Sequence, residues 1–239
     1  MRDLGSGAVR KGTLAGVGRG VGGGGGRCSV GWVNRILIVT AVEAEAEAVR
    51  LGLPEGEHGV EVVVGGVGAA RAAAVTARAL AVDSGYGAVL SLGIGGGFAG
   101  KAEVGGLLLA RRVVAADLGA DSPGGFLSVD SLGFGSSTLD GGRVPGLSAV
   151  VGTILTVNTV TGTDSRAAEL MSRYPAAVGE AMEGYGVACA AALVSLPFAE
   201  VRAVSNLVGK RDRDTWRLDL AFAALTAAAR PIAEGLEAC

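Results

Sequence analysis

Short apolar runs alternate with segments of helical spacing along residues 35–230. Each run is rich in Val, Ile and Leu and is bounded by Gly, Asp or Arg, which is typical of strands that are buried on both faces. The segments between the runs have the length and the periodicity of helices. We expect strands at 36–39, 60–64, 88–92, 106–114, 153–157 and 199–204, and helices at 43–51, 69–81, 164–172, 183–194 and 214–229.

This alternation of strands and helices predicts an α/β fold. We expect a single three-layer domain over residues 34–239, with a central mixed, largely parallel sheet flanked by helices. Sheets of this kind bind ligands beyond the carboxyl ends of their strands. Functional side chains are therefore expected directly after strands.

Two segments depart from this pattern. Residues 1–33 are rich in Gly and Arg and have no apolar periodicity or signal-peptide core, so we expect a disordered, glycine-rich extension. If translation began at Val33, residues 1–32 would not belong to the protein. Residues 115–150 are polar and glycine-rich, and a loop of that length is usually functional or disordered.

Composition excludes several classes of function. The chain of 239 residues has a net charge of -2 without a basic stripe, which argues against nucleic acid as a partner. Its apolar runs fall short of the ~18 residues of a membrane span. The cysteines, Cys28, Cys189 and Cys239, have neither zinc-site nor disulfide-framework spacing, and the single histidine, His58, lies in a polar turn. We expect a cytoplasmic protein without a metal site.

Two glycine clusters follow predicted strands. Gly65–Gly68 leads into a helix, where backbone amides either hold an anion or form a tight turn. Gly93–Gly97 contains no cationic side chain and would let a ligand such as a ribose approach the backbone closely. Neither cluster matches a phosphate-binding P-loop or a dinucleotide-binding sequence.

Three glutamates begin the first predicted helix. Successive helical residues are about 100° apart, so Glu43 and Glu47 share a face while Glu45 points nearly opposite. One of them can face a site, or all three can be solvated near the helix start, where the dipole favours acids.

Further polar residues lie within or beside apolar segments. Glu183 precedes an apolar helix, and a charge in that position needs a partner or a ligand. Arg202 lies within an apolar strand and needs a partner unless it reaches solvent at the strand end. Ser205 and Asn206 follow that strand.

Four segments in series resemble the superfamily of methylthioadenosine/adenosylhomocysteine nucleosidases and purine nucleoside phosphorylases. They span nearly all of residues 35–230, and their order is more specific than any one of them. The segments are residues 36–45 (ILIVTAVEAE), 92–97 (LGIGGG), 181–184 (AMEG) and 201–206 (VRAVSN). Residues 205–213 (SNLVGKRDR), with Trp216 after them, resemble the futalosine hydrolase branch. The resemblance implies a nucleoside-phosphorylase-like fold.

The resemblance implies roles for named residues. Glu45 matches the glutamate that activates the attacking water, and Arg202 matches an arginine that helps to hold that water and that glutamate. Met182 and Glu183 match a pair that binds the ribose, with the carboxylate accepting hydrogen bonds from the sugar hydroxyls.

Other matched positions concern the substrate more directly. Gly93 and Ile94 lie in the glycine segment that borders the substrate, and Ile94 replaces a serine that is common in nucleosidases. Ser205 precedes the base-binding position, where Asn206 replaces the aspartate of adenine-specific enzymes. An amide has a donor as well as an acceptor, so Asn206 fits a 6-oxopurine such as hypoxanthine.

The function that we expect is hydrolysis of the N-glycosidic bond of futalosine to hypoxanthine and dehypoxanthine futalosine, in the futalosine route to menaquinone. The partner is then a small nucleoside; no cofactor is expected, and family members generally form homo-oligomers. Contacts to the distal benzoate of futalosine stay open, with four arginines as candidates: Arg166, Arg211, Arg213 and Arg217.

Three alternatives remain open. The first is a nucleosidase for another purine nucleoside, namely methylthioadenosine, adenosylhomocysteine, aminodeoxyfutalosine or inosine. The second is a phosphorylase acting on inosine, although the strand-end loops lack clustered cations and only Arg71 is nearby. The third is a non-catalytic nucleoside-binding protein, which would not need a water-activating acid.

Overall fold

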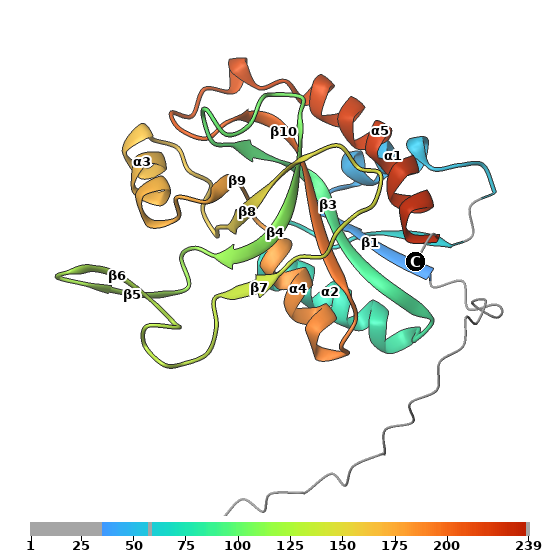
Figure 1. The fold of residues 1–239 in the computed structure, drawn as a ribbon, viewed down its shortest axis with the longest axis horizontal. Helices are drawn as coiled ribbons and strands as arrows, with labels where there is room; N and C mark the ends of the chain where they lie inside the picture. Colours follow the sequence, from blue (N-terminus) through green and yellow to red (C-terminus); the bar gives the residue numbers. More distant parts are fainter. Residues whose placement is uncertain (1–34, 57–58, 238–239) are drawn as a thin grey trace, which may run out of the picture. The chain divides into compact units, whose positions relative to one another are not determined.

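The computed structural model describes residues 35–56 and 59–237. The described residues belong to one folded unit (Figure 1). The expected extension at 1–33, the alternative start at Val33 and the turn histidine His58 lie outside the described residues.

Helices and strands alternate along most of this unit. Their bounds are β1 (Arg35–Thr40), α1 (Glu43–Gly52), β2 (Val60–Val64), α2 (Ala69–Val82), β3 (Tyr86–Gly97), β4 (Leu107–Ala115), β5 (Gly119–Ser122), β6 (Gly125–Ser128), β7 (Thr138–Asp140), β8 (Val150–Thr156), α3 (Asp164–Arg173), β9 (Ala177–Ala181), α4 (Gly184–Leu193), β10 (Phe198–Leu207), the 3-10 turn η1 (Arg213–Thr215) and α5 (Leu218–Glu237).

The central sheet is mixed. Its strand order is β10-β4-β8-β9-β3-β1-β2, and β10 also pairs with β3, so that five of these strands close into a ring. Parallel pairs join β1 to β2, β1 to β3, β3 to β10, β4 to β8 and β8 to β9. The pairs β4–β10, β3–β9 and β4–β7 are antiparallel. The expected α/β architecture is therefore confirmed as a mixed sheet.

Helices cover both faces of the sheet. The alternating residues of β1 divide between two cores, because successive strand side chains point to opposite faces. Leu37 packs in the core that α2 and α4 cover, while Ile36 and Ile38 pack in the core beneath α1 and α5. Figure 1 shows these two helix pairs on different sides of the sheet.

Several predicted boundaries were wrong. Strand β3 continues through Gly93–Gly97, which the sequence indicated as a loop, and pairs there with β10 and β9. Helix α5 begins at Leu218 rather than residue 214, after η1, and continues past Pro231. Residues 115–150 contain the β5–β6 hairpin and β7, whose short, exposed segments have no apolar run to reveal them. Strand β9 was missed because its buried residues are mostly small.

Candidate active site

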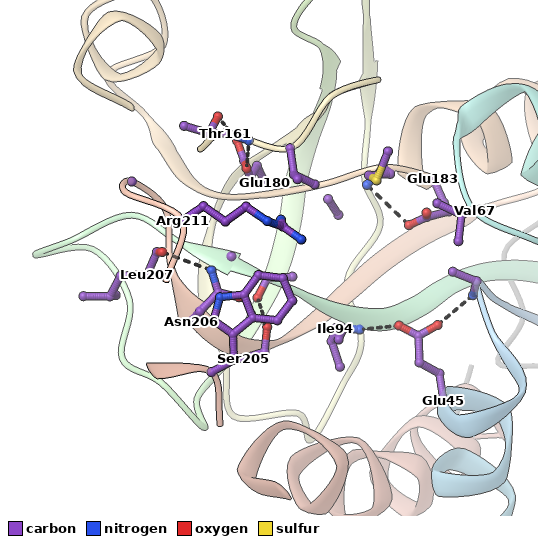
Figure 2. Close-up of a pocket in the computed structure, with 18 of the residues that line it drawn as sticks. Glu45, Val67, Ile94, Thr161, Glu180, Glu183, Ser205, Asn206, Leu207 and Arg211 are labelled. Atoms are coloured by element: carbon purple, nitrogen blue, oxygen red, sulfur yellow. Dashed lines mark hydrogen bonds between the residues drawn. The ribbon is translucent and has the colours of Figure 1, made fainter. Parts of the chain in front are cut away.

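A pocket of about 330 Å³ lies at the carboxyl ends of β3 and β10. Residues from α1, β3, β9, β10 and the segment after β10 line it, as Figure 2 shows. Six of the eight residues for which the resemblance implies roles line this pocket: Glu45, Ile94, Met182, Glu183, Ser205 and Asn206.

Glu45 is buried and held by backbone N–H groups. It is 2% exposed, whereas Glu43 and Glu47 on the opposite face of α1 are exposed. Its Oε2 accepts from the N–H of Ala41 at 2.8 Å and of Val42 at 3.1 Å, and its Oε1 accepts from Ile94 N–H at 2.9 Å. These bonds tie α1 to β3 and fix the carboxylate at the pocket wall.

The carboxylate of Glu183 lies where β9 passes into α4. Its Oε1 accepts from the backbone N–H of Gly68 at 3.1 Å, and its Oε2 accepts from Met182 N–H at 3.3 Å. Gly68 has a φ of +93°, which a residue with a side chain rarely adopts. The anion at the Gly65–Gly68 turn is thus a carboxylate of the protein itself.

Arg202 lies behind the pocket and does not line it. It is 1% exposed; its Nη1 is 3.2 Å from Glu183 Oε2 and its Nε donates to Glu200 Oε1 at 2.8 Å. Its Nη2 donates to Ser91 Oγ at 2.7 Å. Within the described chain its direct ion-pair partners are Glu183 and Glu200.

The buried carboxylates keep Arg202 charged. Burial alone would lower the pKa of Arg202, but the charges of Glu200, Glu183 and Glu45 outweigh burial, and the pKa lies above its ordinary value. Burial also raises the pKa of Glu200, whose Oε2 is the one buried side-chain oxygen or nitrogen without a hydrogen-bond partner in the described part of the chain. Removing the arginine would leave these acids uncompensated.

Gly93 does not line the pocket either. A Cβ at this position would lie 2.7 Å from Glu45 Oε1 and 2.8 Å from Arg202 Nη1, which is closer than real Cβ atoms approach other atoms. Two other glycines of the same cluster, Gly95 and Gly96, do line the pocket. The space above Gly93 holds the carboxylate and the guanidinium instead.

The amide of Asn206 has a fixed orientation. The carbonyl oxygen of Leu207 can only accept, so the amide atom 3.0 Å from it is the nitrogen, Nδ2. On the other side, Ser205 Oγ has one hydrogen and two acceptors in reach, Asn206 Oδ1 at 2.7 Å and the backbone oxygen of Gly95 at 3.2 Å, and the shorter contact is the bond to the amide. The NH₂ group keeps a second hydrogen with which it can donate into the pocket.

Sequence reasoning missed Glu180 and Thr161. Both line the pocket, and Glu180 is 5% exposed. Burial raises the pKa of Glu180, and the hydrogen bonds from Thr161 offset part of that rise. The sequence provided little sign of them because β9, in which Glu180 lies, has no run of bulky apolar residues.

A cationic and aromatic wall closes the side of the pocket after β10. Arg211 and Trp216 line the pocket, and the guanidinium carbon of Arg211 lies 5.1 Å from the centroid of the Trp216 ring. Of the four arginines considered for the benzoate, Arg211 is the one that lines this pocket, while Arg166 and Arg217 pair with Glu169 and Asp219.

The described residues contain no group of three or more His, Cys, Asp or Glu side chains that could hold a metal ion. None of the helices in this part of the chain has the length and apolar character needed to cross a membrane.

Comparison with known proteins gives consistent matches. Residues 42–236 match the model of the Phosphorylase superfamily. The chain is 46% identical to futalosine hydrolase of Streptomyces coelicolor, over 84% of this chain and 96% of the relative. It is 48% identical to futalosine hydrolase of Acidothermus cellulolyticus, over 80% of this chain and 90% of the relative.

The fold is also similar to solved structures. A 5'-methylthioadenosine/S-adenosylhomocysteine nucleosidase from Colwellia psychrerythraea, in complex with adenine, aligns with a TM-score of 0.69. The alignment covers 84% of this chain and 94% of the nucleosidase, at 21% identity, so the likeness concerns the fold.

Proposed function

The chain belongs to the futalosine hydrolase family of the Phosphorylase superfamily, and from this membership we propose that its pocket hydrolyses the N-glycosidic bond of futalosine. The products are hypoxanthine and dehypoxanthine futalosine, in the futalosine route to menaquinone. The observation that carries the proposal is that Glu45, Glu183 and Asn206 line one pocket and that hydrogen bonds hold each of their side chains.

Glu45 is the general base of the proposed reaction. Its carboxylate takes a proton from a water molecule as the water oxygen bonds to the anomeric carbon of the ribose. The bond from that carbon to the base nitrogen breaks, and its electron pair leaves with the base, which departs as an anion and takes a proton from solvent to become hypoxanthine. Glu45 then releases the proton of the water to solvent. The three backbone donors hold the carboxylate, so little reorganisation is needed when the water binds.

Glu183 is the ribose-binding carboxylate, with Met182 beside it. A carboxylate accepts hydrogen bonds from two adjacent hydroxyls, which fixes the sugar relative to the water. Arg202 does not face the ligand and acts as a positioning residue, since its guanidinium holds Glu183 through an ion pair. Its effect on the attacking water is therefore indirect.

Asn206 stabilises the departing base. Its NH₂ donates to oxygen 6 or nitrogen 7 of hypoxanthine, while Ser205 holds its oxygen. An amide cannot deliver a proton as an acid would, so stabilisation by hydrogen bonding carries this step. Hypoxanthine is a better leaving group than adenine, which suits an enzyme without a general acid.

The direct test is an assay of hypoxanthine release from futalosine in buffers with and without phosphate. Aminodeoxyfutalosine, inosine and methylthioadenosine serve as competing substrates. We expect hypoxanthine from futalosine at the highest kcat/KM and at a rate that phosphate does not change. A rate that requires phosphate identifies a phosphorylase, and no base release from any of the four identifies a binding protein.

We also infer a cytoplasmic enzyme that works as a homo-oligomer. The cysteine spacing gives no disulfide framework, which suits a reducing compartment. Apolar side chains remain exposed at the pocket, including Val67 at 53% and Leu207 at 47%. Light scattering after size exclusion should give a mass above that of the 23.5 kDa chain, and a monomer at assay concentrations would contradict this inference.

A further inference from the structure

We propose that Glu180 is a second specificity-determining residue, which accepts a hydrogen bond from the N–H at ring position 1 of a 6-oxopurine. Thr161 holds the carboxyl group for this purpose. The inference rests on the proposed function in one respect, namely that the pocket binds a purine base.

Glu180 lies at the pocket end of β9, and the proposed hydrolysis gives its side chain no role. It is 5% exposed, and yet it lines the pocket. Burying a carboxylate is costly unless donors satisfy it. The described chain provides these donors from Thr161 alone, and no lysine or arginine forms an ion pair with Glu180 there.

Thr161 holds the carboxyl group from one side. Its backbone N–H donates to Oε1 at 2.8 Å, and its hydroxyl donates to Oε2 at 2.6 Å. This two-point contact fixes the plane of the group, as Figure 2 shows. Each carboxylate oxygen can accept a further hydrogen bond, so an acceptor remains for a ligand in the pocket.

Gly96 relates Glu180 to Asn206. Gly96 pairs with Asn206 of β10 on one side and with Glu180 of β9 on the other, and all three residues line the pocket. A Cβ on Gly96 would lie 2.8 Å from Val208 Cγ2 and 3.7 Å from both Asn206 Nδ2 and Glu180 Cγ, so a side chain there would crowd this corner of the pocket. A flat ring in the pocket beside this glycine can touch the amide and the carboxylate with adjacent positions of one edge.

Hypoxanthine offers that edge in the matching order. Its oxygen 6 accepts and the neighbouring nitrogen 1 carries a hydrogen, so Asn206 donates to the first and Glu180 accepts from the second. In a 6-aminopurine the pattern is reversed, because the amino group donates and nitrogen 1 accepts. The amide and the carboxylate would each face a group of the same kind, and unpaired buried polar groups are penalised.

The first test uses the wild-type protein and free bases. Calorimetry compares the affinities for hypoxanthine and 1-methylhypoxanthine, which lacks the N–H. We expect hypoxanthine to bind roughly tenfold to a hundredfold more tightly, the range for losing one buried hydrogen bond. Equal affinities would overturn the proposal.

The second test separates hydrogen bonding from the bulk of the methyl group. Glu180→Met keeps approximately the length of the side chain but removes the carboxylate that accepts the hydrogen bond. The preference for hypoxanthine over the methylated base should shrink by about tenfold or more in this variant. Glu47→Gln, an exposed change on α1, should leave it as in the wild type. A preference that persists in Glu180→Met means steric exclusion and overturns the proposal.

These binding measurements test the role of Glu180 independently of whether the protein hydrolyses futalosine. If the wild type hydrolyses futalosine but binds both bases equally, the function holds and the role of Glu180 is wrong. If the preference depends on Glu180 but futalosine is not hydrolysed, the base recognition holds and the proposed substrate is wrong.

Discussion

The hydroxyl of Ser205 donates to Oδ1 of Asn206 across 2.7 Å. Because the carbonyl of Leu207 accepts from Nδ2 of the same amide, the donor and acceptor ends of Asn206 are fixed from both sides. The amide therefore meets a ligand as a donor. A pocket that selects 6-oxopurines needs this orientation.

Ser205→Ala should weaken this selection. The amide loses the bond to its oxygen and can rotate, so kcat/KM for futalosine should fall by up to about tenfold, the scale of one neutral hydrogen bond. Ser205→Thr, which keeps the hydroxyl, should retain most of the activity. Steady-state kinetics on the three proteins measure the effect, and an unchanged Ser205→Ala would contradict the role of this hydroxyl.

Glu45→Gln should lower kcat by ~100-fold or more, the usual scale for loss of a general base. The KM for futalosine should change little, because the amide has the same size as the carboxyl group. Glu43→Gln and Glu47→Gln are the matched controls on the exposed face of α1 and should be mild. If Glu43→Gln were the crippling change, the assignment of the base would be wrong.

Gly93→Ala should reduce activity through Glu45. The added Cβ would meet Glu45 Oε1 at 2.7 Å and Arg202 Nη1 at 2.8 Å, so the carboxylate must shift. A displaced catalytic group commonly costs about a hundredfold in rate. Gly124→Ala is the control, since its Cβ would meet nothing nearer than 3.8 Å. Equal rates for the two variants would show that Glu45 tolerates the methyl group or is not the base.

Arg202→Met should destabilise the fold by about 3–5 kcal/mol, because Glu183 and Glu200 lose a buried positive partner. Arg112→Met removes an exposed ion pair of 3.7 Å and should cost about 1 kcal/mol or less. Urea unfolding followed by circular dichroism gives both values. Similar losses for the two variants would mean that the buried ion pairs contribute little.

Local sequence periodicity predicted part of this site. The spacing of about 100° per residue predicted that Glu45 lies on a different face of the helix from Glu43 and Glu47. The structure confirms this, because Glu45 is buried while Glu43 and Glu47 are exposed. Which residues share a helix face depends only on their spacing along a few residues, so it can be inferred from a single sequence. The helices around the sheet were predictable for the same reason, apart from their ends.

Long-range contacts were not predictable in this way. Glu180 and Thr161 are nineteen positions apart, and only the folded chain brings them together. Gly93 looked like part of a loop because glycine disfavours strands. Its reason for being glycine is the space that Glu45 and Arg202 occupy, and those residues come from two other elements.

The central claim, that this pocket selects and cleaves a 6-oxopurine nucleoside, is tested most directly at Asn206. The measurement is the ratio of kcat/KM for futalosine to kcat/KM for aminodeoxyfutalosine, in the wild type and in Asn206→Asp. The variant places a carboxylate oxygen near the carbonyl of Leu207, and the repulsion between these oxygens should lower kcat/KM for both substrates. The ratio is therefore more informative than either value alone.

We predict that the wild type favours futalosine and that the ratio falls by roughly tenfold to a hundredfold in the variant, since a carboxylate accepts from the 6-amino group. A ratio that stays the same, or that moves further toward futalosine, would contradict the account.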